Sequence, residues 1–197
     1  TTPGLTWTGC AVAPNGLGLN AVVALPDGGF AATSPRTSDI WEWHTGDGWT
    51  QVPGSEDIGP NGIEVSPDGQ WFLVAGYASQ SVIRLSRGQT PVQIDRVGVD
   101  FNIDNVHWAP DGTLLAAGHS APTRGRVGEC IARRTCEGIV SHVARVDTET
   151  MTARSIFRYP TNSALILGTT AIEVDKELWV GQVAGGTRIA RVPLPTQ

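Results

Sequence analysis

Apolar and polar residues alternate along most of this chain in short segments that end at Gly, Pro, Asp or Asn. A period of two residues places successive side chains on opposite faces of a strand, so this pattern predicts β-strands joined by tight turns. The stretches that could form a helix are all short. The chain is therefore expected to be all-β.

One phrase recurs along the sequence: a polar residue, then an apolar strand, then a Pro-Asp-Gly turn. The turns begin at Pro26, Pro67 and Pro110, with spacings of 41 and 43 residues, and a weaker fourth copy surrounds Asp175. In the three clear copies an oxygen-bearing residue stands seven positions before the turn Asp; these residues are Asn20, Asn61 and Asp104.

Four strands in every ~40–45 residues are typical of the blades of a β-propeller. The predicted blades span residues 18–53, 59–95, 102–158 and 164–194, and residues 1–13 are expected to form a strand left over from a preceding blade. A parallel-helix solenoid is the structural alternative, but its repeats are shorter.

About four blades and a leftover strand predict a partial propeller, a single domain over residues 1–197. Inner strands left exposed at the ends of an open ring would be an aggregation hazard. The chain also starts Thr1-Thr2-Pro3, without an initiator Met or an apolar signal segment. We therefore expect a missing N-terminal segment or a second chain to complete the ring.

Composition narrows the class of protein and its compartment. The formal net charge of −5 and the lack of a basic run argue against binding to nucleic acid or anionic membranes. No apolar stretch approaches the ~20 residues that span a bilayer. Cys130 and Cys136 are close enough in sequence to form a disulfide, which would imply an oxidising, secreted or periplasmic location. Cys10 is left as a buried thiol or as a bridge to another segment.

The innermost strand of each propeller blade runs along the central tunnel, so Asn20, Asn61 and Asp104 should lie at one mouth of it. The second strand of each blade returns to this mouth, and the strand ends are marked by Ser34, Tyr77, His119 and Gln182. With Asn105 beside Asp104, the donors are all oxygens, which calcium prefers, whereas zinc prefers His or Cys. The alternative interpretation is that Asn and Asp merely begin strands after turns.

The repeats, taken together, resemble the paraoxonase and regucalcin–gluconolactonase superfamily of six-bladed calcium propellers, particularly its bacterial arylesterase-like members. The residues that carry the resemblance are 19–30, 59–69 and 103–112, with 169–170 and 178–181 in the last blade. The resemblance implies that the catalytic calcium ligands are Asn20, Asn61, Asp104 and Asn105. It also implies that His119 lines the substrate pocket.

Two departures from the family pattern matter. The first acidic calcium ligand and the paraoxonase histidine pair would both lie before Thr1, so a further carboxylate is expected from the missing part. Paraoxonases have an Asp for a second, structural calcium where this chain has Ala21. The resemblance therefore implies one Ca²⁺ and leaves the second in doubt.

These features predict a calcium-dependent hydrolase of lactones or esters. The metal would polarise the carbonyl group, and Asp104 or His119 would take a proton from the attacking water. Two alternatives stay open: a non-catalytic propeller that serves as a binding scaffold, and a hydrolase subunit with Thr1 as its nucleophile. His107 is interpreted as structural, because it lies within a strand beside Trp108.

The longest insertion, residues 120–138, emerges at the predicted metal mouth and contains both cysteines of the expected disulfide. Its arginines are Arg124, Arg126, Arg133 and Arg134. We expect it to be a disulfide-pinned lid that shapes the substrate pocket and favours an anionic group.

Overall fold

The computed structural model describes residues 4, 7, 9–133, 136–184 and 187–194. These residues form four antiparallel sheets and one helix, and each sheet is a simple meander in which consecutive strands pair. The first sheet contains β1 (Val22–Ala24), β2 (Phe30–Ser34), β3 (Asp39–His44) and β4 (Gly48–Gln51). The second contains β5 (Pro60–Val65), β6 (Trp71–Gly76), β7 (Ser81–Ser86) and β8 (Ile94–Gly98).

The third and fourth sheets continue the same pattern. The third contains β9 (Asn102–Trp108), β10 (Leu114–Ser120), β11 (Val140–Asp147) and β12 (Thr152–Pro160). Helix α1 (Arg124–Arg133) lies between β10 and β11. The fourth contains β13 (Gly168–Val174), β14 (Glu177–Gln182) and β15 (Ala190–Pro193).

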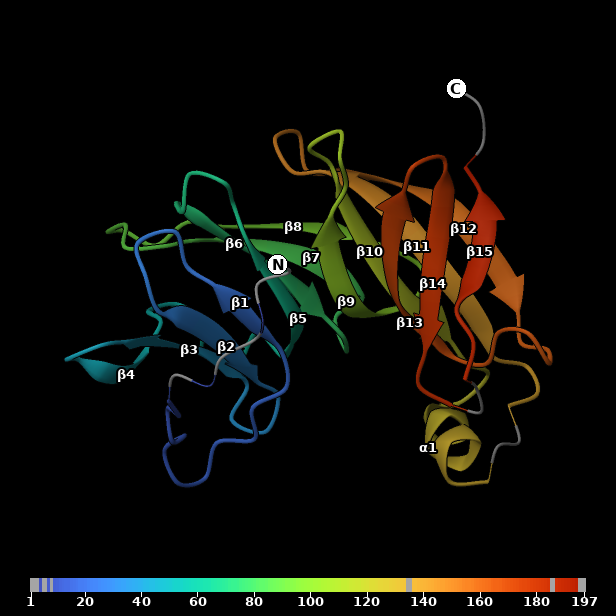
Figure 1. The fold of residues 1–197 in the computed structure, drawn as a ribbon, viewed down its shortest axis with the longest axis horizontal. Coiled ribbons are helices and arrows are strands. Elements are labelled where there is room, and N and C mark those ends of the chain that lie inside the picture. The colour runs from blue at the N-terminus through green and yellow to red at the C-terminus, as the bar shows by residue number, and fades with distance from the viewer. Residues whose placement is uncertain (1–3, 5–6, 8, 134–135, 185–186, 195–197) are drawn as a thin grey trace.

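The four sheets are the blades of an open propeller (Figure 1). Their first strands, β1, β5, β9 and β13, lie side by side around a common hub. Within the described residues the first and last sheets do not pack against each other, so the ring is not closed. The prediction of a partial all-β propeller is confirmed.

The core consists of three apolar layers, one between each pair of neighbouring blades. Strand β6 shows why the layers form: Phe72 and Val74 pack toward the first blade, whereas Leu73 and Ala75 pack toward the third. Because successive side chains of a strand point to opposite faces, a central blade is apolar on both sides.

The repeated Pro-Asp-Gly turns depend on their glycines. Gly28, Gly69 and Gly112 have φ angles of 93°, 73° and 82°, a region that residues with a Cβ atom rarely adopt. In the second blade Asp68 Oδ1 also accepts hydrogen bonds from Ser66 Oγ and from the Gln70 N–H. The turn chemistry thus explains the recurring sequence phrase.

The structure corrects two details. The described residues of the expected leftover strand, 4, 7 and 9–13, are not in a strand, and the others lie outside the described residues. Helix α1 was not expected.

In the part of the chain described above, no helix is long and apolar enough to cross a membrane.

Candidate functional site

Strand β5, which contains Asn61, packs against β9, which contains Asp104, and the two strands approach closely at Gly62. A Cβ atom at Gly62 would lie only 2.6 Å from the Cα of Asn105 and 2.8 Å from the carbonyl oxygen of Asp104. Glycine is therefore required next to Asn61, and the predicted ligands of these two blades lie at the same end of the hub.

The side chain of Asn105 joins the third blade to the fourth. Its Nδ2 donates to Asp104 Oδ1 at 2.9 Å and to the Thr169 carbonyl oxygen at 3.0 Å. These two bonds use both amide hydrogens, which leaves the Oδ1 atom available to a ligand.

The side-chain oxygen of Asn61 accepts no hydrogen bond from the described residues. This Oδ1 atom is buried. A buried acceptor without a partner costs roughly 1–3 kcal/mol, so a cation that bound this oxygen would remove a penalty.

Asp104 is a carboxylate in an unfavourable environment. Burial raises its pKa to about 6. A neighbouring positive charge favours the ionised form and would lower this pKa again. The hub therefore has a carboxylate whose ionised form a cation would stabilise.

Asn20 lies at the start of the first blade, just before β1, and its backbone is tied to the same region. Its N–H donates to the Thr33 carbonyl oxygen at 2.9 Å, and Thr33 Oγ1 donates to the Asn61 carbonyl oxygen at 2.6 Å. The Asn20 side chain is exposed. All four predicted ligands are thus on neighbouring inner strands or immediately before one.

Amide and carboxylate oxygens make up this donor set, which fits a hard cation such as Ca²⁺. Among the described residues, no group of three or more His, Cys, Asp or Glu side chains is placed to hold a metal. A cation at this hub would therefore depend on the Asn side chains.

His119, at the end of β10, is almost completely buried, with 2% of its surface exposed. Its Nε2 lies 2.7 Å from the Tyr77 hydroxyl, and its Nδ1 is buried without a hydrogen bond of normal geometry in the described part of the chain. Burial lowers the pKa of His119, although the nearby Gly168 backbone opposes this shift. The imidazole is therefore neutral near pH 7. Its Nε2 atom contacts the Tyr77 hydroxyl.

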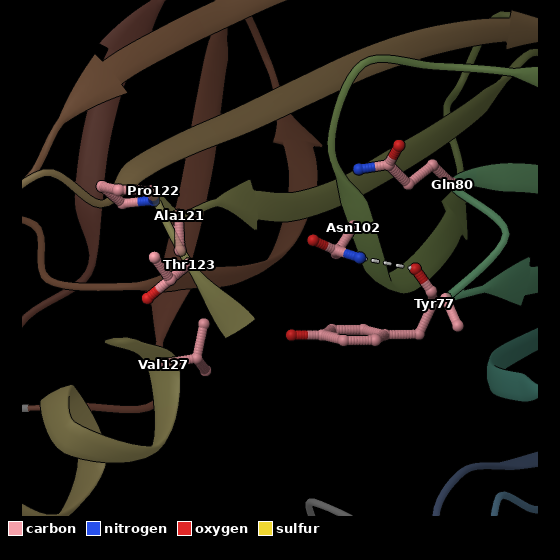
Figure 2. Close-up of a pocket in the computed structure, with 8 residues that line it drawn as sticks. Tyr77, Gln80, Asn102, Ala121, Pro122, Thr123 and Val127 are labelled. Carbon is pink, nitrogen blue, oxygen red and sulfur yellow. Dashed lines mark hydrogen bonds between the residues drawn. The ribbon is translucent and has the colours of Figure 1, made fainter. Parts of the chain in front are cut away.

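Tyr77, which contacts this histidine, is part of the wall of a cavity of about 560 Å³ (Figure 2). All the side chains that line it are uncharged: Tyr77, Ala78, Gln80, Asn102, Ala121, Pro122, Thr123 and Val127. The Asn102 side chain donates to the Tyr77 carbonyl oxygen at 2.8 Å, which links the two blades at the cavity wall.

The insertion contributes to the cavity through its first residues rather than through its arginines. Arg126 forms an ion pair with Glu129 and also donates to the Glu137 carbonyl oxygen. Arg134 lies outside the described residues. The described lining thus gives no support to the expected preference for an anionic group.

The expected disulfide between Cys130 and Cys136 is present, and both cysteines are buried. They pack against Ile139, Leu167 and Ala184, so the disulfide anchors α1 to the end of the fourth blade. Cys10 is free and exposed, which rules out the buried thiol that we considered.

His107 contacts neighbouring inner strands, in agreement with its interpretation as a structural residue. Its Nδ1 lies 3.1 Å from Glu64 Oε1 and its Nε2 lies 2.9 Å from Thr170 Oγ1. It therefore connects three inner strands. The sequence did not single out Glu64 or assign a role to Tyr77, although Tyr77 follows a second strand that ends at the predicted mouth.

Fold and donor set together define a β-propeller with an oxygen-lined hub. No protein-family model and no curated protein sequence matches the chain. Among solved structures, a gluconolactonase from Xanthomonas campestris matches with a TM-score of 0.60 and 16% identity, over 90% of this chain and 57% of that chain. Virginiamycin B lyase from Staphylococcus aureus matches with a TM-score of 0.60 and 14% identity, over 94% of this chain and 58% of that chain.

A provisionally named 6-phosphogluconolactonase from Bacteroides uniformis matches with a TM-score of 0.57 and 19% identity, over 89% of this chain and 52% of that chain. The chain thus spans a little over half the length of these structures. At such identities the likeness shows the fold alone, and at that level it confirms the predicted resemblance to gluconolactonase propellers.

Proposed function

We propose that the chain forms the metal-binding part of a calcium-dependent hydrolase of lactones or esters. The observation that carries this proposal is the buried Asn61 Oδ1, which has no hydrogen-bond partner among the described residues and lies on the inner strand next to that of Asp104. Gluconolactonases among the structures that share the fold support a lactone as substrate.

In this proposal Asn20, Asn61, Asp104 and Asn105 hold the Ca²⁺. Bound there, Ca²⁺ supplies electrostatic stabilisation of the negative charge that develops on a carbonyl oxygen. The Asn105 amide keeps the Asp104 carboxylate in place by its hydrogen bond. Asp104 and His119 are the candidate proton acceptors for the attacking water.

The remainder of the site would come from a complementary N-terminal fragment or a second chain that closes the ring and adds an acidic ligand. The open first and last sheets support this part of the proposal, as does the share of the neighbouring structures that the chain covers. The disulfide favours a secreted or periplasmic protein.

The test is hydrolysis of δ-valerolactone and phenyl acetate by the purified protein, with and without a calcium chelator. Chelation should abolish the activity and added Ca²⁺ should restore it. Asp104→Asn should lower kcat/KM about 100-fold, since charge stabilisation at such sites contributes at least this much. Asp47→Asn, in an exposed turn of the first blade, is the matched control and should behave as wild type.

Other outcomes decide between the alternatives. Protein that binds Ca²⁺ in a calorimetric titration but hydrolyses neither compound would support a binding scaffold. Protein that hydrolyses both compounds without bound Ca²⁺ would overturn the metal proposal. Thr1 lies outside the described residues, and full activity of a Thr1→Ala variant would remove the N-terminal nucleophile.

A further inference from the structure

Tyr77 occupies the position between His119 and the cavity. The phenol oxygen lies 2.7 Å from His119 Nε2, and the two rings are 5.6 Å apart with a tilt of 60°. Tyr77 lines the cavity, whereas His119 is not among the lining residues. Among the described residues, Tyr77 therefore provides a hydrogen-bonded connection from the cavity to His119.

Figure 2 shows the side chain of Tyr77 extending across the cavity, with its hydroxyl directed toward Thr123 and Val127 of the insertion. The residue follows β6 in the second blade, and His119 is the penultimate residue of β10 in the third. The pair thus connects neighbouring blades at the mouth where the candidate metal ligands lie. Asp104 is close enough for its charge to act on Tyr77.

We propose that Tyr77 is a catalytic residue that passes a proton from the attacking water to His119. This inference rests on the proposed function. In the step, an O–H bond of water breaks and its proton moves to the Tyr77 oxygen, while the Tyr77 proton moves to His119 Nε2. The hydroxide formed adds to the carbonyl carbon of the ester or lactone, and His119 becomes the imidazolium.

The electrostatic environment is consistent with this direction of transfer. Burial and the Asp104 charge both raise the pKa of Tyr77, so its phenol keeps a proton to donate. Burial lowers the pKa of His119, so the imidazole is neutral and has a lone pair to accept that proton. The Gly168 backbone near the ring would favour the imidazolium once it forms.

A double-mutant cycle on the lactonase activity tests the relay. Tyr77→Phe and His119→Gln should each lower kcat about 100-fold with little change in KM, because proton transfer typically contributes 10²–10⁴-fold. The double variant should be no slower than either single variant, since both remove one relay. The chain has two tyrosines, and Tyr159→Phe is the matched control that should keep full activity.

Results that differ from these expected activities would contradict the relay. Wild-type activity in Tyr77→Phe, or full activity in His119→Gln, would overturn the relay while leaving the proposed hydrolase intact. Multiplicative losses in the double variant would show two independent roles and would also overturn it.

A measurement that does not depend on hydrolysis separates the inference from the proposed function. In the ¹⁵N spectrum of labelled protein, saturating γ-butyrolactone should shift His119 Nε2 in wild type but not in Tyr77→Phe. This shift in a protein that hydrolyses no ester or lactone would reject the proposed function yet support the contact through Tyr77. No shift in an inactive protein would overturn both.

Discussion

At the scale of single residues, His142 makes the stability of the folded protein depend on pH. Its ring stacks on Phe101 with centroids 4.9 Å apart, and its Nε2 lies 2.9 Å from Ser120 Oγ. Burial lowers the pKa of His142 below 6.5, with a smaller effect from Arg158, while Asp100 opposes the shift. The folded protein therefore resists protonation of this ring more than the unfolded chain does.

This difference predicts an acid-sensitive contribution to stability. Above pH 6.5 His142 is neutral in both states and its contribution is complete. As the pH falls below 6.5 the unfolded chain takes up the proton first, so stability declines until the folded pKa is reached. Urea unfolding at pH 7.5 and 5.5 should show a smaller drop for His142→Gln than for wild type. Equal drops would contradict the prediction.

At the scale of elements, α1 and its disulfide determine one wall of the cavity. Ala121, Pro122, Thr123 and Val127 line the cavity, whereas the candidate metal ligands lie on the inner strands or just before one. The disulfide closes a short loop, with a sequence separation of 6 residues, and such a cross-link contributes about 2 kcal/mol by chain entropy. Its loss should therefore affect the cavity more than the hub.

A Cys130→Ser/Cys136→Ser variant should show faster hydrogen exchange in α1 and a several-fold higher KM for lactones. Its calcium affinity should stay within about twofold of wild type. Cys10→Ser, which changes an exposed free cysteine, is the control. Unchanged kinetics in the double variant would reject the role of the insertion in shaping the pocket.

At the scale of the whole molecule, the open ring leaves apolar side chains exposed on both terminal blades. Val22 of β1 is 66% exposed and Ile172 of β13 is 44% exposed, whereas their strand neighbours Val23 and Ala171 pack against adjacent blades. Closure of the ring by further blades would cover these side chains.

Native mass spectrometry should therefore find the chain in assemblies heavier than 20.8 kDa, either with a complementary fragment or with a second chain. Ile172→Asp should weaken the assembly, because it would bury an unpaired charge at the junction. Ile94→Asp, on the outer strand β8, is the control and should leave the mass unchanged. A lone, stable monomer of wild-type protein would contradict ring completion.

The sequence by itself determined the repeated unit of this protein. Alternating apolar residues define the strands, and the glycines at positions 28, 69 and 112 are needed for the positive φ of the turns. The position of Asn61 and Asp104, seven residues before each turn Asp, follows from strand length alone. Such information is local, because strand period and turn chemistry depend on residues near one another in the chain.

Only the tertiary structure decided how the blades meet. Tyr77 and His119 are 42 residues apart, and they touch because adjacent blades stack with their second strands ending at the same mouth. The same stacking buries Asn61 Oδ1 without a hydrogen-bond partner in the described part of the chain. Helix α1 was missed because its apolar side chains, such as Val127 and Cys130, are covered by residues of the fourth blade. Contacts of this kind depend on packing between distant segments, which no local sequence pattern specifies.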